Sequence, residues 1–425
     1  ARRHLNGTLQ VQPVRTGPDL HAFIALPYRL HAADPNWVPP LRRDVRMLLD
    51  RAKNPFFEHG EAEYFLATRA GAVVGRIAAV VNTLHNEIHA DKVGFFGFFE
   101  CENDQAVADA LFDAASAWLR ARGFDTMRGP ASFSVNDECG LLVDGYDTPP
   151  TIMMPHNPPY YVQLVEHAGF RKAKDLFVYQ GGDLTMRAYK PVHERLTRAV
   201  EIMKSRMGVT LRPIDMKRFH EEIELVKSLY NRSWEKNWGF VPMTDHEIDH
   251  LAEQFKPVIM PDLITFAEKD GVPVGFSLAI PDFNVVFRAN RQGRLTPWLI
   301  VRLLWALKRE TIRRARIPLL GVVPEFRGRG LDSVLYHAVW TKAAEHGIYW
   351  GEGGWILEDN PAAATPERKI ETLRTLQAAG HAVAMVGDGV NDAPVLAQAD
   401  VSFALAHGAQ IARSAADAVL LSGRL

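Results

Sequence analysis

Two aspartates near the C-terminus have the spacing of a small divalent-metal site. Asp388 and Asp392 stand four residues apart in the segment MVGDGVNDAP (385–394). We expect a strand over 381–386, after which Gly387 and Gly389 allow the backbone to turn sharply. The two carboxylates then converge beyond the strand, and Mg²⁺ takes one or two such ligands together with phosphate and water. The pattern predicts Mg²⁺ binding beside a phosphate, and the alternative is a plain turn between strand and helix.

The same segment, together with TPERK (365–369), SFA (402–404) and AADAVLL (415–421), resembles the hinge and metal motif of P-type cation-transporting ATPases. These pumps are part of the haloacid dehalogenase-like superfamily. The resemblance implies that Asp388 and Asp392 hold Mg²⁺ and that Lys369 binds a phosphate. The nucleophile string DKTGT of the pumps does not occur in this sequence. We therefore expect weak Mg²⁺ binding, no phosphoenzyme and no ATP hydrolysis.

A second phosphate-type motif is the segment VVPEFRGRGL (322–331), placed between an expected strand and an expected helix. Small residues there let backbone N–H groups approach phosphates at the positive end of the helix. The segment resembles motif A of the GNAT (acyl-CoA N-acyltransferase) enzymes, which implies binding of acetyl-CoA or another acyl-CoA. The implied cofactor-binding residues are Val323, Arg327, Gly328, Arg329, Gly330 and Leu331. The sequence departs from the motif at Asp332, where the family has a small residue.

The next expected strand carries the candidate catalytic residue. Glu352 lies in YWGEGGWILEDN (349–360) and would act as general base toward an amine if burial raises its pKa. The alternative is an exposed glutamate without a catalytic role. Asn360 stands where the GNAT family has an asparagine after its fifth strand.

The first half has the alternating and helical patterns of a mixed α/β domain. Expected strands are 9–14, 64–68, 73–81, 93–100, one near Thr126 and 171–179. Expected helices are 19–31, 159–167 and one that follows the fourth strand, has Val107, Leu111, Ala114 and Trp118 on one face, and stops at Gly123. That order also resembles the GNAT fold. The turn after the fourth strand reads CENDQ (101–105), whose acids would repel a phosphate, so we expect this half not to bind CoA.

A polar loop, GPASFSVNDECG (129–140), and the later MMPHNPPYY (153–161) look like the signature of a bacterial family of tandem GNAT-like proteins. Such a loop is either functional or an Ω-like loop that satisfies its own backbone. A second copy of the pattern begins near Val209, with strands at 209–214, 263–268, 272–280 and 319–323 and a helix at 217–235. Its helix-rich insert, 297–315, favours an amphipathic cover or a partner face over a membrane-surface role, because its basic residues do not form a run.

Composition sets the remaining limits. There are 49 basic and 50 acidic residues, for a formal net charge of -1, so nothing in the charge balance points to nucleic acid or an anionic membrane. Only two cysteines occur, which fits a reducing compartment, and we expect a cytoplasmic protein with a processed or truncated start. No apolar run is long enough to span a membrane.

The fold class predicted from these patterns is α/β, with two GNAT-like mixed-sheet domains at 1–182 and 183–362 and a short haloacid dehalogenase-like parallel fragment at 363–425. The tail either completes the second sheet or folds as a separate parallel unit. The expected function is acyl-CoA-dependent N-acylation of an unknown amine, in a small molecule or a peptide. Two alternatives are a non-enzymatic ligand-binding or interaction protein, and a fragment of a P-type metal-transporting ATPase that binds Mg²⁺ and nucleotide phosphate.

Overall fold

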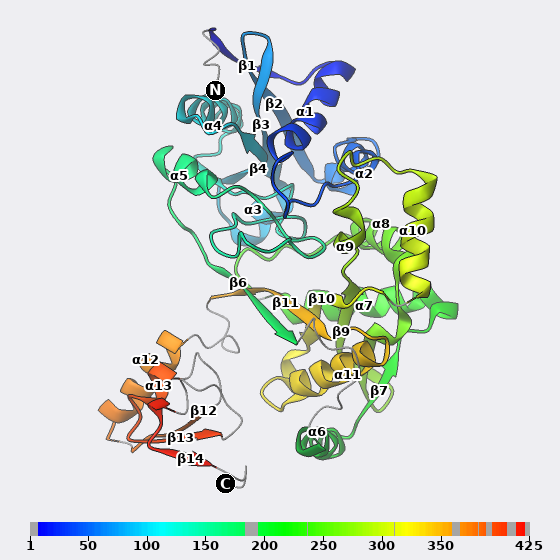
Figure 1. Cartoon of the computed structure of the whole chain (residues 1–425), viewed down its shortest axis with the longest axis vertical. Coiled ribbons are helices and arrows are strands. Elements are labelled where there is room, and N and C mark those ends of the chain that lie inside the picture. The colour runs from blue at the N-terminus through cyan, green and yellow to red at the C-terminus, as the bar shows by residue number, and fades with distance from the viewer. Residues whose placement is uncertain are drawn as a thin grey trace. The chain divides into compact units, whose positions relative to one another are not determined.

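The computed structural model in Figure 1 describes residues 7–182, 194–235, 237–309, 311–358, 366–380, 382–387, 393–405 and 414–420. The chain forms two compact units. The first contains Ala1–Ala173 and Val178–Gly354, and the second contains Lys174–Phe177 and Trp355–Leu425. Among the described residues, no helix is both long and apolar enough to cross a bilayer.

A five-stranded sheet forms the first half of the larger unit. Its strands, in spatial and sequence order, are β1 (Leu9–Pro13), β2 (Gly60–Arg69), β3 (Ala72–Asn82), β4 (Val93–Cys101) and β5 (Thr126–Arg128). Neighbouring strands are antiparallel up to β4, whereas β4 and β5 are parallel. Its helices are α1 (Gly17–Leu30), α2 (Arg42–Leu48), α3 (Thr83–His89), α4 (Gln105–Arg120) and α5 (Tyr160–His167).

The helix after β4 shows how the apolar pattern builds this core. Val107 and Leu111 of α4 lie one helical turn apart and are fully buried, and they pack with Leu164 of α5 in one cluster with the sheet residues. Asp104 caps the helix, because its side chain accepts a hydrogen bond from Ala106 N. The sequence pattern predicted this strand–helix–strand order correctly, and it missed only the short helices α2 and α3.

A six-stranded sheet forms the second half. Its spatial order is β6 (Leu176–Gly182), β11 (Trp350–Leu357), β10 (Arg314–Val322), β9 (Val272–Pro281), β8 (Ile264–Lys269) and β7 (Val209–Pro213). Its helices are α6 (Glu194–Met207), α7 (Phe219–Trp234), α8 (Asp245–Phe255), α9 (Asn284–Phe287), α10 (Pro297–Lys308) and α11 (Leu331–Glu345). The predicted insert 297–315 is therefore a helix followed by the start of β10, which begins five residues earlier than expected.

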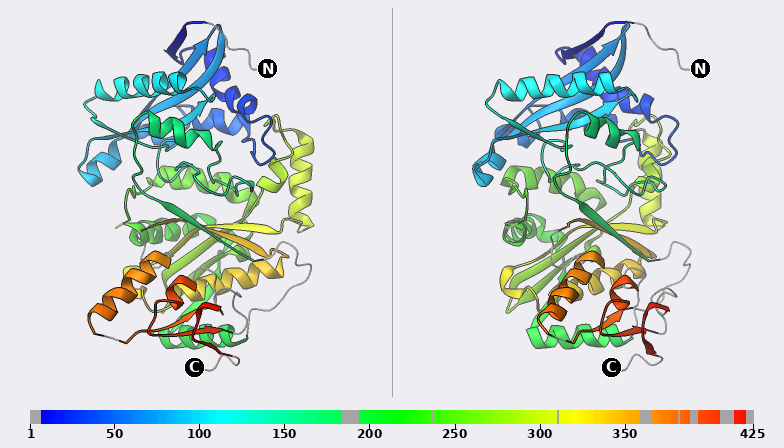
Figure 2. Two further views of the ribbon diagram at one scale, coloured as in Figure 1. Left: turned by 60° about the vertical axis from the view of Figure 1, so that its left-hand side comes forward. Right: turned by 90° about the vertical axis from the view of Figure 1, so that its left-hand side faces the viewer.

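The strand β6 corrects one sequence-based expectation. We expected it to be the last strand of the first half, but it lies beside β11 in the second sheet (Figure 2). A Cβ on Gly182 would meet the Tyr349 carbonyl oxygen, and Glu358 N donates to Asp175 O at 3.1 Å, so the two strands run in opposite directions. The physical reason is edge length, because β5 offers three residues for pairing whereas β11 offers eight.

The C-terminal tail has a sheet of its own. The strands β12 (Ala384–Gly387), β13 (Val401–Leu405) and β14 (Ala418–Leu420) are parallel and form a three-stranded sheet in that order. The helices α12 (Pro366–Ala378) and α13 (Ala393–Leu396) accompany it. The separate parallel unit is thus confirmed, and the expectation that the tail completes the second sheet is wrong, since β6 takes that place.

Candidate functional site

Two parallel strands of the second sheet pair over only part of their length. The ladder between β10 and β11 runs from Arg314 opposite Trp350 to Ile317 opposite Gly353. Beyond that point β10 continues to Val322 along β9, and β11 continues to Leu357 beside β6. The end of this ladder lies between the glycine-rich turn, which follows β10, and the candidate base on β11.

Glu352 lies in the ladder, opposite Arg316, and its side chain is buried. The Thr151 hydroxyl donates a hydrogen bond to one carboxylate oxygen, and Gln180 Nε2 donates to the other at 3.1 Å. Two donors fix the orientation of this carboxylate. An exposed position for Glu352, which the sequence left open, is excluded.

Arg316 supplies a buried positive charge beside that carboxylate. Its guanidinium donates to the backbone oxygens of Ile152 and Gly354, each at 2.8 Å. Burial lowers the pKa of Arg316, and the negative charges of Glu352 and Asp282 act in the opposite direction. A charged side chain within an apolar strand thus ties the segment around Ile152, between β5 and α5, to the second sheet.

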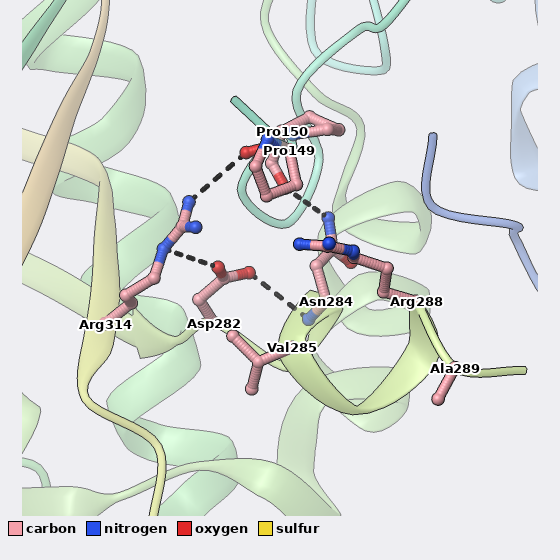
Figure 3. A pocket seen from close by; sticks show the side chains of 8 residues that line it. All are labelled: Pro149, Pro150, Asp282, Asn284, Val285, Arg288, Ala289 and Arg314. Carbon is pink, nitrogen blue, oxygen red and sulfur yellow. Dashed lines mark hydrogen bonds and ion pairs between the residues drawn. The ribbon is translucent and has the colours of Figure 1, made fainter. Parts of the chain in front are cut away.

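A cavity of about 280 Å³ adjoins this cluster (Figure 3). Asp282, at its base, accepts hydrogen bonds from the backbone N–H groups of Ile152 (3.1 Å) and Asn284 (3.2 Å). Arg314 Nε is 3.1 Å from its other oxygen, close enough for an ion pair although the two groups are not aligned as a hydrogen bond. Burial raises the pKa of Asp282 to about 6. Pro149 and Pro150 form the opposite wall.

A larger and mostly apolar pocket of about 450 Å³ lies on the other face of the same ladder. Ala315, Ile317 and Gly351 line it, and these residues alternate along the strands with Arg316 and Glu352. Trp340 of α11 forms part of its wall. The polar cluster and the apolar pocket therefore occupy opposite faces of the strands at the point where their pairing ends.

The glycine-rich turn has the backbone that the motif requires. Gly328 and Gly330 have φ of +68° and +86°, a conformation that disfavours side chains. A Cβ on Gly328 would meet nothing within 4 Å, so a ligand can approach this backbone. Gly330 is the N-cap of α11 and provides no side-chain cap, while Leu331 and Val323 are buried on either side. The helix end has no side-chain cap, which fits a phosphate group, while Met203 of α6 packs against Gly330, where a Cβ would lie 2.6 Å from its sulfur.

The charged residues of the turn are arranged less simply than the motif suggests. The Arg327 guanidinium donates to the backbone oxygens of Ser233 (2.7 Å) and Val322 (3.2 Å), so it anchors the turn. Arg329 is exposed and lies over the Phe326 ring. Asp332 lies exposed in the first turn of α11, where its charge opposes an anion.

The equivalent turn of the first half is occupied by its own side chains. Asp104 caps α4 and forms an ion pair with Arg69, and Glu102 pairs with Arg29 at 2.8 Å. Gly97 of β4 lies against the backbone of the polar loop, since a Cβ there would be 2.2 Å from Ala131 O. This half therefore offers no free helix end for a phosphate at this turn.

Sequence reasoning missed several buried polar residues. Asp282, Arg316 and Thr151 belong to the site described above. In the first half, Glu100 binds His31 Nε2 and the Tyr161 hydroxyl, each at 2.7 Å, with Arg76 3.7 Å away. The available signal was a charged residue inside an otherwise apolar strand, as in VVGRIAAVV (73–81), FFGFFEC (95–101) and RARIPLL (314–320). The partners of these charges are distant in sequence and could not be inferred.

The phosphate and metal residues predicted in the tail are only partly described. Lys369 lies in α12, and its side chain lies outside the described part of the chain. Asp388 and Asp392 both lie outside the described residues. Among the residues that are described, no group of three or more His, Cys, Asp or Glu side chains could hold a metal ion. Mg²⁺ binding at the two aspartates stays a prediction.

The C-terminal part of the chain, from within α11 onward, is similar to a hydrolase family and to metal pumps. A family model for haloacid dehalogenase-like hydrolases matches residues 336–400. The probable copper-transporting ATPase HMA5 of Arabidopsis thaliana is 56% identical over 84 residues, which are 19% of this chain and 8% of that protein. The chain thus spans a small part of such a pump.

Solved structures with a similar arrangement include a tandem GNAT protein from the clavulanic acid biosynthesis pathway. It is 15% identical, with a TM-score of 0.47 and coverage of 84% of this chain and 92% of that one. A fungal GCN5-related glucosamine N-acetyltransferase region, within a GH3 β-N-acetylglucosaminidase, is 16% identical, with a TM-score of 0.48 and coverage of 82% and 36%.

Two curated relatives match most of the chain. Protein YghO of Escherichia coli (strain K12) is 39% identical over 348 residues, which are 80% of this chain and 87% of that protein. The bacterial ceramide synthase of Caulobacter vibrioides is 41% identical over 365 residues, which are 84% of this chain and 92% of the synthase. With this identity over nearly the whole of the synthase, the chain belongs to the family that contains bacterial ceramide synthase.

Proposed function

We propose that the protein is an N-acyltransferase that transfers a long acyl group from an acyl-CoA to the amine of a long-chain amino alcohol. The observation that carries the proposal is the position of the end of the β10–β11 ladder, between an uncapped, glycine-rich helix end and the buried Glu352. The similarity to a ceramide synthase supports this substrate pair, because a ceramide is the amide of a fatty acid and a long-chain amino alcohol.

The residues at each end of the ladder have separate roles in this reaction. The turn at Gly328 and Gly330 would hold the CoA phosphates. The amine nitrogen forms a bond to the thioester carbon, the carbon–sulfur bond breaks, and the thiol leaves with a proton. Glu352, held in place by Thr151 and Gln180, takes the proton that the amine loses and passes it to the departing sulfur, so that the thiol leaves neutral and the carboxylate is restored.

The larger pocket provides room for an apolar chain. The pocket of about 450 Å³ lies within the size range of small-molecule sites, and its walls are mostly apolar. It adjoins the ladder on the face opposite Glu352, so a chain attached to the thioester carbon would enter it while the amine approaches from the polar face. The cavity at Asp282 is lined by Asp282, Arg288 and Arg314, which would suit the polar end of the amino alcohol.

The purified full chain tests the proposal directly. We expect it to form an amide from palmitoyl-CoA and sphinganine, measured by mass spectrometry, with one free thiol released for each amide. Acetyl-CoA, a short primary amine and a peptide serve as alternative substrates. CoA at 100 times its Kd should stabilise the chain by roughly 2.7 kcal/mol. Stabilisation by CoA without amide formation would identify a ligand-binding protein instead. If CoA does not stabilise the chain and no amide forms, both the CoA-binding role and the catalytic role of the site are refuted.

A further inference from the structure

The helix α10 exposes an apolar face that the rest of the larger unit does not cover. Its outward side chains are Trp298 (73% exposed), Ile300 (43%), Val301 (54%), Leu304 (57%) and Trp305 (55%). These positions lie on one side of the helix, and α10 runs along the outside of the unit in Figures 1 and 2. Scattered single exposures are common on proteins, whereas a contiguous apolar patch marks an interaction surface.

The opposite side of α10 already anchors it to the fold. Leu299 and Ala306 are buried in a cluster with Phe283 and Ile312. The Thr296 side chain caps the helix by accepting from Leu299 N at 3.2 Å. The helix is therefore apolar on both sides, and the outer side is not needed to hold it in place.

The basic residues around this helix indicate the kind of partner that it binds. The stretch 283–309 contains six basic residues and no acidic one, although the chain as a whole is near neutral. These residues are Arg288, Arg291, Arg294, Arg302, Lys308 and Arg309. Arg291 binds backbone oxygens within the unit, whereas Arg302, Lys308 and Arg309 are exposed on or beside α10. Basic residues around exposed tryptophans fit an anionic lipid surface, where tryptophan rings insert at the headgroups.

We infer that α10 binds the surface of a membrane that carries anionic lipids, lying parallel to it with the tryptophan face inserted. The sequence favoured a cover or a partner face over this role, and the proposal takes the membrane-surface alternative because the basic residues flank the apolar face in space without forming a run. The segment that leads into α10 also lines the cavity at Asp282, through Val285, Arg288 and Ala289 (Figure 3). A membrane-embedded amphiphile would therefore meet this cavity beside α10. The inference stands on the exposed face and its charge, and does not depend on acyl transfer.

Sedimentation of the full chain with lipid vesicles tests it. We expect binding to vesicles of phosphatidylcholine mixed with phosphatidylglycerol, much weaker binding to phosphatidylcholine alone, and loss of binding at high salt. Each basic residue near an anionic surface contributes about fivefold to binding. Replacing Arg302, Lys308 and Arg309 by Gln should thus weaken binding on the order of a hundredfold.

A separate variant and its control test the contribution of the apolar face to vesicle binding. Trp298→Ala combined with Trp305→Ala should abolish vesicle binding while leaving the thermal midpoint unchanged, because both rings are exposed. Val143→Ser with Val272→Ser changes equally exposed apolar residues elsewhere and should bind like the parent chain. Vesicle binding by the tryptophan variant would overturn the inference. The inference would also be overturned if the parent chain does not bind vesicles but forms a dimer, and the tryptophan variant does not form this dimer.

Discussion

Replacing Glu352 with Gln separates a catalytic carboxylate from a merely structural one. The side-chain shape is kept, and the Gln carbonyl oxygen can still accept from the Thr151 hydroxyl. The new amide group would face the Gln180 amide, which now donates to a carboxylate oxygen at 3.1 Å. One hydrogen bond to a charged group is lost, at a cost of about 1.5–3 kcal/mol. Arg316 also loses a neighbouring negative charge.

We therefore expect a thermal midpoint several degrees lower, since about 1 kcal/mol shifts the midpoint of a domain of this size by roughly 2–4 °C. Amide formation should fall by at least about a hundredfold, the usual contribution of a positioned base. Thr151→Val is the matched control. It removes one donor to the carboxylate, costs a similar amount of stability and keeps the base.

The comparison of the two variants decides the role of the carboxylate. Both should be assayed for amide formation at a temperature where circular dichroism shows them folded. If Glu352→Gln keeps activity within about tenfold of the parent, then Glu352 only holds the segment around Thr151 against the sheet. The general-base assignment would then be wrong. A smaller loss in Thr151→Val would reflect poorer positioning of a base that is still present.

Three other perturbations test the turn, the cavity and the tail. The double variant Gly328→Val, Gly330→Val should abolish stabilisation by CoA. Gly271→Val, which also changes a glycine at positive φ (+78°), should leave stabilisation by CoA intact. Equal loss of stabilisation in both variants would show a general effect of backbone strain. Because burial raises the pKa of Asp282 to about 6, the folded state binds the extra proton, so stability should rise as pH falls from 7 to 5. Asp282→Asn should make that rise smaller, with a remainder from other buried acids such as Asp137, whose pKa burial raises to about 7, and a slope unchanged in this variant would exclude Asp282 as a source. A chain ending after Glu358 should stay monomeric with an unchanged thermal midpoint for the larger unit, because β6 covers the edge of β11; aggregation would contradict this.

Local signals predicted the elements and the glycine-rich turn well. Gly328 and Gly330 stand between a strand and a helix, and both the positive φ values and the uncapped helix end follow from residues adjacent in sequence. The surroundings of Glu352 were beyond such reasoning, because its two donors are 201 and 172 residues away in the chain. Packing between the halves determines which strand contacts which loop, and a local sequence pattern does not predict these contacts.

The strand β6 shows why a sequence pattern that predicts the strands of each half correctly does not predict how the two halves are joined. Its apolar residues predict a strand without indicating which sheet it joins, because backbone hydrogen bonding is the same at any open edge. By pairing with β11 it brings Gln180 to Glu352, so a segment that follows the first half in sequence completes the site of the second. Thr151 and Ile152 make the same connection from the segment between β5 and α5. A first half expressed alone would keep β6 without its partner strand, and a second half alone would lack three residues of its site. The two halves are therefore one functional unit, and the site requires both of them in one folded chain.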